Sequence, residues 1–177
     1  MPGDSALKIV VAGPKGSGKT LISNFLASGC SPDLPLSSEN YSPTSGVRIL
    51  EFESREGNLE IWDASGDHSF ESCWKAIMHS ADGVILVYNP DAPSQDQQLA
   101  DWFDFFVRKN GLRDEQCLIF AHRAGKTATS DRFRPPPLFS KVTAALTTPQ
   151  SGSDIKNLFD DLLRSISGRG GGQRTAK

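Results

Sequence analysis

The sequence predicts an α/β domain in which six strands form a mostly parallel sheet with helices on both faces. Short apolar runs of the length of a buried strand recur along the chain, and segments with helical spacing of apolar residues lie between them. The chain has 177 residues, of which 37% are hydrophobic, enough to bury one core without disulfides or a structural metal. We therefore expect one domain.

The N-terminal part predicts a strand, a glycine loop and a helix. Residues 7–12 (LKIVVA) form an apolar run that stops at Gly13, as in a strand buried on both faces. Residues 20–28 repeat apolar side chains with a helical period. Residues 29–46 are rich in Ser, Pro and Asp and have no such period, so we expect a long mobile loop there, a kind of loop that is usually functional.

The middle of the chain predicts a β-hairpin, a strand and a helix. Apolar and charged residues alternate in 47–53 and again in 59–62, which indicates two antiparallel strands. Residues 84–88 (VILVY) predict a buried strand, and residues 94–110 predict a helix whose aromatic side chains lie in the core. Trp74 falls in a further helical segment, where a core position is favoured over a partner contact.

The C-terminal part predicts two more strands and a final helix. Residues 117–121 (CLIFA) predict a buried strand, and residues 141–147 are the candidate for the last strand. Between them, residues 122–137 are polar, basic and end in three prolines, so we expect an irregular connection in place of a fourth helix. Residues 154–166 have the apolar stripe of an amphipathic helix.

Composition limits the possible partners and compartment. The net charge of −2 gives no long-range attraction for nucleic acid or anionic lipid. The cysteines, Cys30, Cys73 and Cys117, have neither metal-binding nor disulfide-framework spacing, which favours a reducing compartment such as the cytoplasm. We expect a domain over 1–167, a disordered Gly/Arg tail over 168–177, no membrane span and, without a C-terminal cysteine, no lipid anchor.

A glycine-rich sequence, GPKGSGKT, follows the first predicted strand and precedes the first predicted helix. It matches G-x-x-x-x-G-K-[ST], in which backbone N–H groups surround phosphate oxygens, Lys19 reaches the β- and γ-phosphates and Thr20 offers a hydroxyl to Mg²⁺. An ordinary glycine-rich turn is the alternative. The predicted phosphate-binding residues are Gly13, Pro14, Lys15, Gly16, Ser17, Gly18, Lys19 and Thr20.

A second motif narrows the function. Asp63-Ala64-Ser65-Gly66 ends the predicted hairpin; its Asp63 can hold Mg²⁺ through water and the N–H of Gly66 can sense a γ-phosphate. The two motifs together favour a nucleotide switch. A P-loop kinase of a nucleoside or small metabolite is the alternative, with the basic segment 123–134 as a weak candidate for its lid.

The chain up to about residue 167 resembles the small GTPases of the Ras superfamily. The resemblance implies a Ras-like G domain that binds GTP or GDP with Mg²⁺. It also implies that Thr44 is the threonine of the first switch that ligates Mg²⁺ in the triphosphate state, and that the second switch starts at WDASG. The implied metal-side residues are Thr20, Thr44 and Asp63.

Two longer runs, 40–53 (NYSPTSGVRILEFE) and 66–89 (GDHSFESCWKAIMHSADGVILVYN), resemble the Rab-like small GTPase of intraflagellar transport, a subunit of complex B. This resemblance implies a nucleotide-dependent docking module in the assembly of the cilium or flagellum. Its partners would be coiled-coil subunits of complex B, which contact the switch segments 40–46 and 64–78. Its location would be the cytoplasm and the cilium or flagellum with its base.

Two residues depart from the family pattern for hydrolysis. Asp67 stands where a glutamine usually orients the attacking water, and an ionised carboxylate cannot donate a hydrogen bond to water. Lys15 stands where a glycine is common, and its side chain would crowd the γ-phosphate. We expect slow or negligible GTP hydrolysis and assign no confident catalytic residue.

The guanine-reading motif N-K-x-D is also missing. His122-Arg123-Ala124-Gly125 follows the strand instead, and 147–149 match the last base-contacting loop poorly. His122 could make a ring contact and Arg123 could stack on the base, with a solvated loop as the alternative. A pseudo-GTPase that keeps nucleotide as a fixed structural ligand is therefore a third interpretation.

Overall fold

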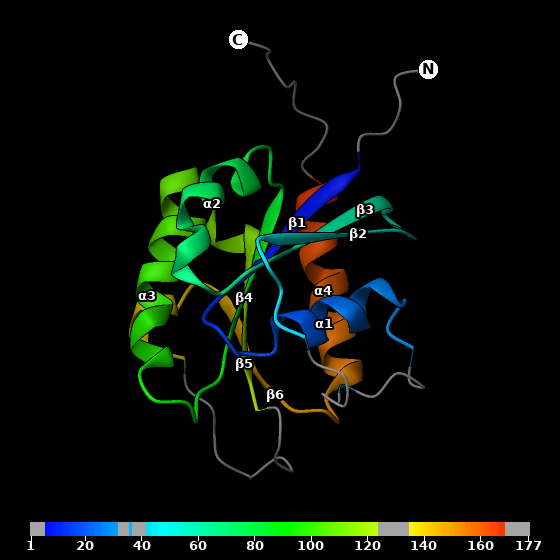
Figure 1. The fold of residues 1–177 in the computed structure, drawn as a ribbon. Coiled ribbons are helices and arrows are strands. Elements are labelled where there is room, and N and C mark those ends of the chain that lie inside the picture. The colour runs from blue at the N-terminus through cyan, green and yellow to red at the C-terminus, as the bar shows by residue number, and fades with distance from the viewer. Residues whose placement is uncertain (1–5, 32–35, 37–41, 124–134, 169–177) are drawn as a thin grey trace.

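The computed structural model describes residues 6–31, 36, 42–123 and 135–168. Its centre is a six-stranded sheet in the order β2-β3-β1-β4-β5-β6 (Figure 1). Strand β2 is antiparallel to β3, and the other neighbouring strands are parallel. The strands are β1 (Leu7–Ala12), β2 (Val47–Ser54), β3 (Gly57–Ala64), β4 (Gly83–Tyr88), β5 (Cys117–His122) and β6 (Thr143–Thr147).

In the described part of the chain four α-helices cover the sheet, two on each face (Figure 1). They are α1 (Lys19–Ala27), α2 (Glu71–Met78), α3 (Gln95–Phe106) and α4 (Gly152–Ser167). The apolar sides of α1 and α4 share one hydrophobic core, and those of α2 and α3 share the other. The predicted fold class is confirmed: a mostly parallel sheet with helices on both faces.

The central strands supply both cores because successive side chains of a strand point to opposite faces. In β1, Val10 and Ala12 belong to the core under α2 and α3, and Ile9 and Val11 to the core under α1 and α4. All four are fully buried. A continuous apolar run was therefore the correct signature of a strand covered on both sides.

Several element ends differ from the predictions. The second hairpin strand is longer than 59–62, because a two-residue turn lets Gly57 pair with Ser54. Helix α3 ends at Phe106 instead of residue 110, because Arg108–Asn110 form a separate 3₁₀ helix that is closed by Gly111 in a left-handed conformation. The last strand starts at Thr143, two residues later than predicted.

Between β5 and β6 the described residues contain one short 3₁₀ helix, Pro137–Phe139, and most of the connection expected in place of a fourth helix is not described. Residues 124–134 lie outside the described residues, as do half of the expected mobile loop, 32–35 and 37–41, and the expected disordered tail after 168. Trp74 is buried in the core, as predicted. No helix in the described parts of the chain is long and apolar enough to span a membrane.

Candidate nucleotide-binding site

The glycine-rich loop joins the end of β1 to the start of α1, and two of its glycines are required by their surroundings. Gly13 has φ 142°, and a Cβ there would lie 2.0 Å from the carbonyl oxygen of Val87. Gly18 has φ 95°, and a Cβ there would lie 2.7 Å from Cδ2 of His122. The loop thus packs closely against β4 and β5 and opens onto the N-terminus of α1, where backbone N–H groups favour an anion.

Lys19 is the buried cation of this loop. Its Nζ donates a hydrogen bond of 2.7 Å to the carbonyl oxygen of Pro14 and lies 3.5 Å from Oγ of Ser17. Burial lowers the pKa of Lys19 to about 8, and the nearby carboxylate of Asp63 opposes this shift. A buried ammonium group with a single carboxylate near it is suited to bind an anionic phosphate.

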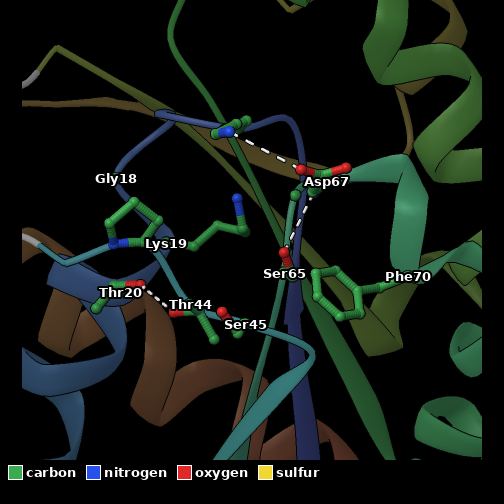
Figure 2. Close-up of a pocket in the computed structure, with 11 residues that line it drawn as sticks. Gly18, Lys19, Thr20, Thr44, Ser45, Ser65, Asp67 and Phe70 are labelled. Carbon is green, nitrogen blue, oxygen red and sulfur yellow. Dashed lines mark hydrogen bonds and ion pairs between the residues drawn. The ribbon is translucent and has the colours of Figure 1, made fainter.

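The three predicted metal-side residues converge. The hydroxyls of Thr20 and Thr44 point toward one another and lie 2.9 Å apart (Figure 2). Thr20 Oγ1 is 2.8 Å and Thr44 Oγ1 is 3.1 Å from Oδ2 of Asp63. The other oxygen of Asp63, Oδ1, is buried with no hydrogen-bond partner among the described residues. Hard oxygen donors of this kind, one with unused capacity, fit Mg²⁺.

Arg48 also contacts this carboxylate, and the sequence analysis missed it. Its Nη2 lies 3.3 Å from Oδ2 of Asp63, which it faces directly in the β2–β3 register. Burial raises the pKa of Asp63, while the Thr20 hydroxyl and the Arg48 guanidinium lower it. The sequence does place an arginine in the first hairpin strand and the motif aspartate in the second. Recognising that the two residues face each other requires the pairing register of the two strands.

The second switch approaches the glycine-rich loop at Gly66. A Cβ on Gly66 would lie 2.6 Å from the backbone nitrogen of Lys15 and 2.7 Å from the carbonyl oxygen of Gly13. The next residue, Asp67, accepts a 2.9 Å hydrogen bond from the N–H of Ser69. Its Oδ2 lies 3.8 Å from Nζ of Lys15. These two contacts, the hydrogen bond foremost, lower the pKa of Asp67 and keep it an ionised carboxylate.

A pocket connects the two switch segments with the loop, and Figure 2 shows Lys19, Thr44 and Asp67 around it. It brings part of the predicted phosphate-binding loop, from Gly18 to Thr20 together with Lys15, around one space with Thr44 and Gly66, whereas Asp63 is not among its lining residues. Its lining residues are Lys15, Gly18, Lys19, Thr20, Pro43, Thr44, Ser45, Ser65, Gly66, Asp67 and Phe70.

The two candidate base-contacting residues lie at the end of β5. His122 is fully buried, its Nδ1 is 3.0 Å from Oγ1 of Thr147, and burial lowers its pKa to about 4, so the ring is neutral. Arg123 donates its N–H to the carbonyl of Thr147, and its Nε lies 3.1 Å from Oδ2 of Asp91. Both side chains are thus held by the protein, and a contact from either to a base stays a prediction.

The strand order, the glycine-rich loop and the convergent switch residues define a P-loop nucleotide-binding domain of the Ras type. The family model "Ras of Complex, Roc, domain of DAPkinase" matches residues 8–125. A Danio rerio protein named intraflagellar transport protein 22 homolog is 41% identical over 146 residues, which cover 77% of this chain and 76% of the relative. The chain therefore belongs to the intraflagellar transport protein 22 family, which confirms the resemblance inferred from the sequence.

Solved structures agree with this assignment. The GTP-bound crystal structure of T. brucei IFT22/74/81 has a chain that superposes with a TM-score of 0.72 at 28% identity, covering 92% of this chain and 97% of that one. The GDP-bound crystal structure of T. brucei IFT22 gives a TM-score of 0.73 at 27% identity, covering 94% and 99%. Neither the family nor these structures favours the kinase alternative.

Proposed function

We propose that this chain binds GTP or GDP with Mg²⁺ and acts as a nucleotide-dependent docking subunit of intraflagellar transport complex B. The observation that carries the proposal is the convergence of Thr20, Thr44 and Asp63 beside the buried Lys19. Guanine nucleotide is supported by the relatives, since T. brucei IFT22 structures are described as GTP-bound and GDP-bound. Bound Mg²⁺ would supply charge neutralisation at the phosphates.

The domain that carries this function spans 1–167 in our proposal, with 168–177 as a tail. Thr44 belongs to the first switch and contacts Thr20 of α1 and Asp63 of β3. A γ-phosphate and its metal ion would join the same set of contacts, so loading with a triphosphate would order the segment that contains Thr44. A partner that contacts this segment would thereby bind the two nucleotide states with different affinity.

The partners we propose are the counterparts of the IFT74 and IFT81 subunits named with the T. brucei relative, bound through coiled-coil segments. The proposed docking surface includes the switch segments 40–46 and 64–78. Between them lies an exposed apolar position: Ile49 of β2 is 44% exposed and pairs with Trp62 of β3. Because β2 follows the first switch and β3 leads into the second, Ile49 would extend one continuous contact surface.

Slow or negligible hydrolysis is part of the proposal. Asp67 is an ionised carboxylate fixed by Ser69, so it offers no hydrogen-bond donor to an attacking water. Lys15 reaches across the same pocket. A protein of this kind would stay loaded for a long time and act through binding, in the cytoplasm and in the cilium or flagellum and its base.

Competition binding tests the proposal. We expect calorimetry to show tight binding of GTP and GDP in excess Mg²⁺, weaker binding of ATP and XTP, and a large loss in Thr20→Asn, because the asparagine removes the hydroxyl at the metal side. Unchanged affinity in Thr20→Asn would contradict the assignment of the metal side. Equal affinity for GTP and ATP would remove guanine selection and leave phosphate binding in place.

Two further measurements separate the alternatives. Mass spectrometry of nucleotide retained by the purified protein, combined with a turnover assay, distinguishes a cycling switch from a pseudo-GTPase, which would retain one nucleotide that does not exchange. Variants Arg123→Ala and His122→Asn test the base side: a change in the GTP-to-ATP preference would support a base contact, whereas an equal loss for both nucleotides would indicate a role in loop packing.

A further inference from the structure

Arg48 links three elements at the metal side of the site. Its Nη2 donates a hydrogen bond of 2.7 Å to Oδ1 of Asn24 on α1 and lies 3.3 Å from Oδ2 of Asp63 on β3. The carboxylate is fully buried, whereas the arginine side chain is 39% exposed. The arginine therefore reaches the carboxylate from the solvent side of the sheet edge.

The position of this cation has an electrostatic consequence. A buried carboxylate is costly without an opposite charge, and phosphates bound at the glycine-rich loop would add further negative charge close to Asp63. Mg²⁺, when bound, is one source of positive charge there. Arg48 is another, carried by the protein itself, and it contacts the same Oδ2 that receives the hydroxyls of Thr20 and Thr44.

We propose that Arg48 is a built-in cation that compensates Asp63 when Mg²⁺ is absent and competes with Mg²⁺ for its carboxylate. Arg48 is thus a positioning residue that acts through Asp63. It makes nucleotide retention depend only weakly on Mg²⁺ and keeps Thr44 beside Thr20 in either condition. The inference rests on the proposed binding of a nucleotide with Mg²⁺ at this site.

The test measures how strongly nucleotide affinity depends on the metal. Dissociation constants for a fluorescent GDP are determined in excess Mg²⁺ and in EDTA, for the full chain and for Arg48→Ala. We expect the ratio of the dissociation constant in EDTA to that in Mg²⁺ to increase by about tenfold or more in Arg48→Ala. Without metal, Asp63 then keeps only Lys19 as a neighbouring cation, and Lys19 must also bind the phosphates. In excess Mg²⁺ the loss of affinity should be smaller, because the metal then supplies positive charge beside Asp63.

Two variants make the result specific. Arg55→Ala removes another arginine of the same hairpin, one that is exposed at the turn, and should leave the ratio unchanged. Asn24→Ala removes the other partner of the guanidinium, lies at an exposed position and should raise the ratio in the same direction as Arg48→Ala but less. Thermal unfolding without ligand shows whether each variant is folded. If Arg48→Ala does not fold, Asn24→Ala still tests the inference.

The outcomes distinguish this inference from the proposed function. If the wild type binds GDP and both Arg48→Ala and Asn24→Ala keep its Mg²⁺ dependence, the inference is wrong and the proposed function stands. If the wild type binds no nucleotide in either condition, the proposed function itself fails. A uniform loss of affinity with an unchanged ratio would show that Arg48 supports the fold of the site and does not replace the metal charge.

Discussion

The ammonium group of Lys15 lies 3.8 Å from Oδ2 of Asp67, so the two departures from a hydrolysing GTPase form one ion pair. Both side chains are largely exposed, and such a pair contributes little to the stability of the fold. Its effect is local: it places a cation and a fixed carboxylate at the mouth of the phosphate pocket. The two residues should therefore be changed together.

The first prediction concerns hydrolysis. Asp67→Gln alone should raise the rate of single-turnover GTP hydrolysis by less than about tenfold, because the Lys15 side chain still lies in the pocket. Adding Lys15→Gly should raise the rate by about a further tenfold or more, because the glutamine amide can then orient water beside an uncrowded phosphate. Quenched-flow or phosphate-release assays measure both. The whole gain appearing in Asp67→Gln would show that the carboxylate alone is limiting, and no gain in the double variant would point to a missing activating protein.

The second prediction uses the pKa of Lys19, which is about 8 in the free protein. Bound phosphates would hold the proton on this lysine, so binding at pH 8.5 should take up protons. Affinity should then fall as pH rises through 8, by about tenfold between pH 7 and pH 9. Calorimetry in two buffers of different ionisation enthalpy measures the uptake. Lys19→Ala should bind more weakly and show neither effect; uptake that persists in this variant would assign the proton to another group.

The third prediction concerns the close approach of Gly66 to the glycine-rich loop. Gly66→Ala should weaken GTP binding by about tenfold or more, because a Cβ there meets backbone atoms of Lys15 and Gly13, which cannot give way as a side chain would. Gly111→Ala is the control, with open space around it and only the cost of a left-handed backbone, about 1 kcal/mol. It should reduce the free energy of unfolding slightly and leave GTP affinity unchanged. Equal affinities in the two variants would contradict the close approach.

The fourth prediction concerns Trp74, which fixes the second-switch helix to its neighbour. Its ring lies 4.6 Å from the ring of Trp102 and 5.2 Å from those of Phe105 and Phe106, all in α3. Trp74→Ala should lower the free energy of unfolding by about 3–5 kcal/mol in urea titration. His68→Ala removes an exposed ring 5.3 Å from Trp74 and should cost much less. Similar losses of unfolding free energy in the two variants would mean that the Trp74 ring does not pack in the core.

The phosphate loop could be predicted from sequence because its chemistry lies within eight consecutive residues between a strand and a helix. Asp63 was found from the D-x-x-G motif after a predicted strand, whereas Thr44 was found only through the resemblance, since nothing in its own segment marks it as a metal-side residue. Arg48 could not be found, because its partner depends on the hairpin register, and a shift of one residue would place it against a different side chain.

The base side shows a second limit. His122 looked like a polar residue after a strand, and a solvated loop was a reasonable alternative. In the structure β5 extends through His122, and its ring is buried under Gly18 and paired with Thr147. The polar character of a residue at a strand end does not reveal whether the neighbouring loops cover it, because that depends on how β5, β6 and the glycine-rich loop meet.

The last prediction tests the proposed docking surface at Ile49. The chain offers a matched control, because Ile49 and Leu138 are the two exposed large hydrophobic residues of the described structure, at 44% and 48%, and lie toward opposite edges of the sheet. Ile49→Glu should weaken binding to the counterparts of IFT74 and IFT81 by about tenfold or more in pull-down and interferometry, since a charge would be buried among apolar contacts. Leu138→Glu should have no effect. Both proteins should keep GDP affinity, because neither residue lines the phosphate pocket. A loss confined to Leu138→Glu would place the interface at the β6 edge, away from the switches, and docking would then have no direct route to the nucleotide.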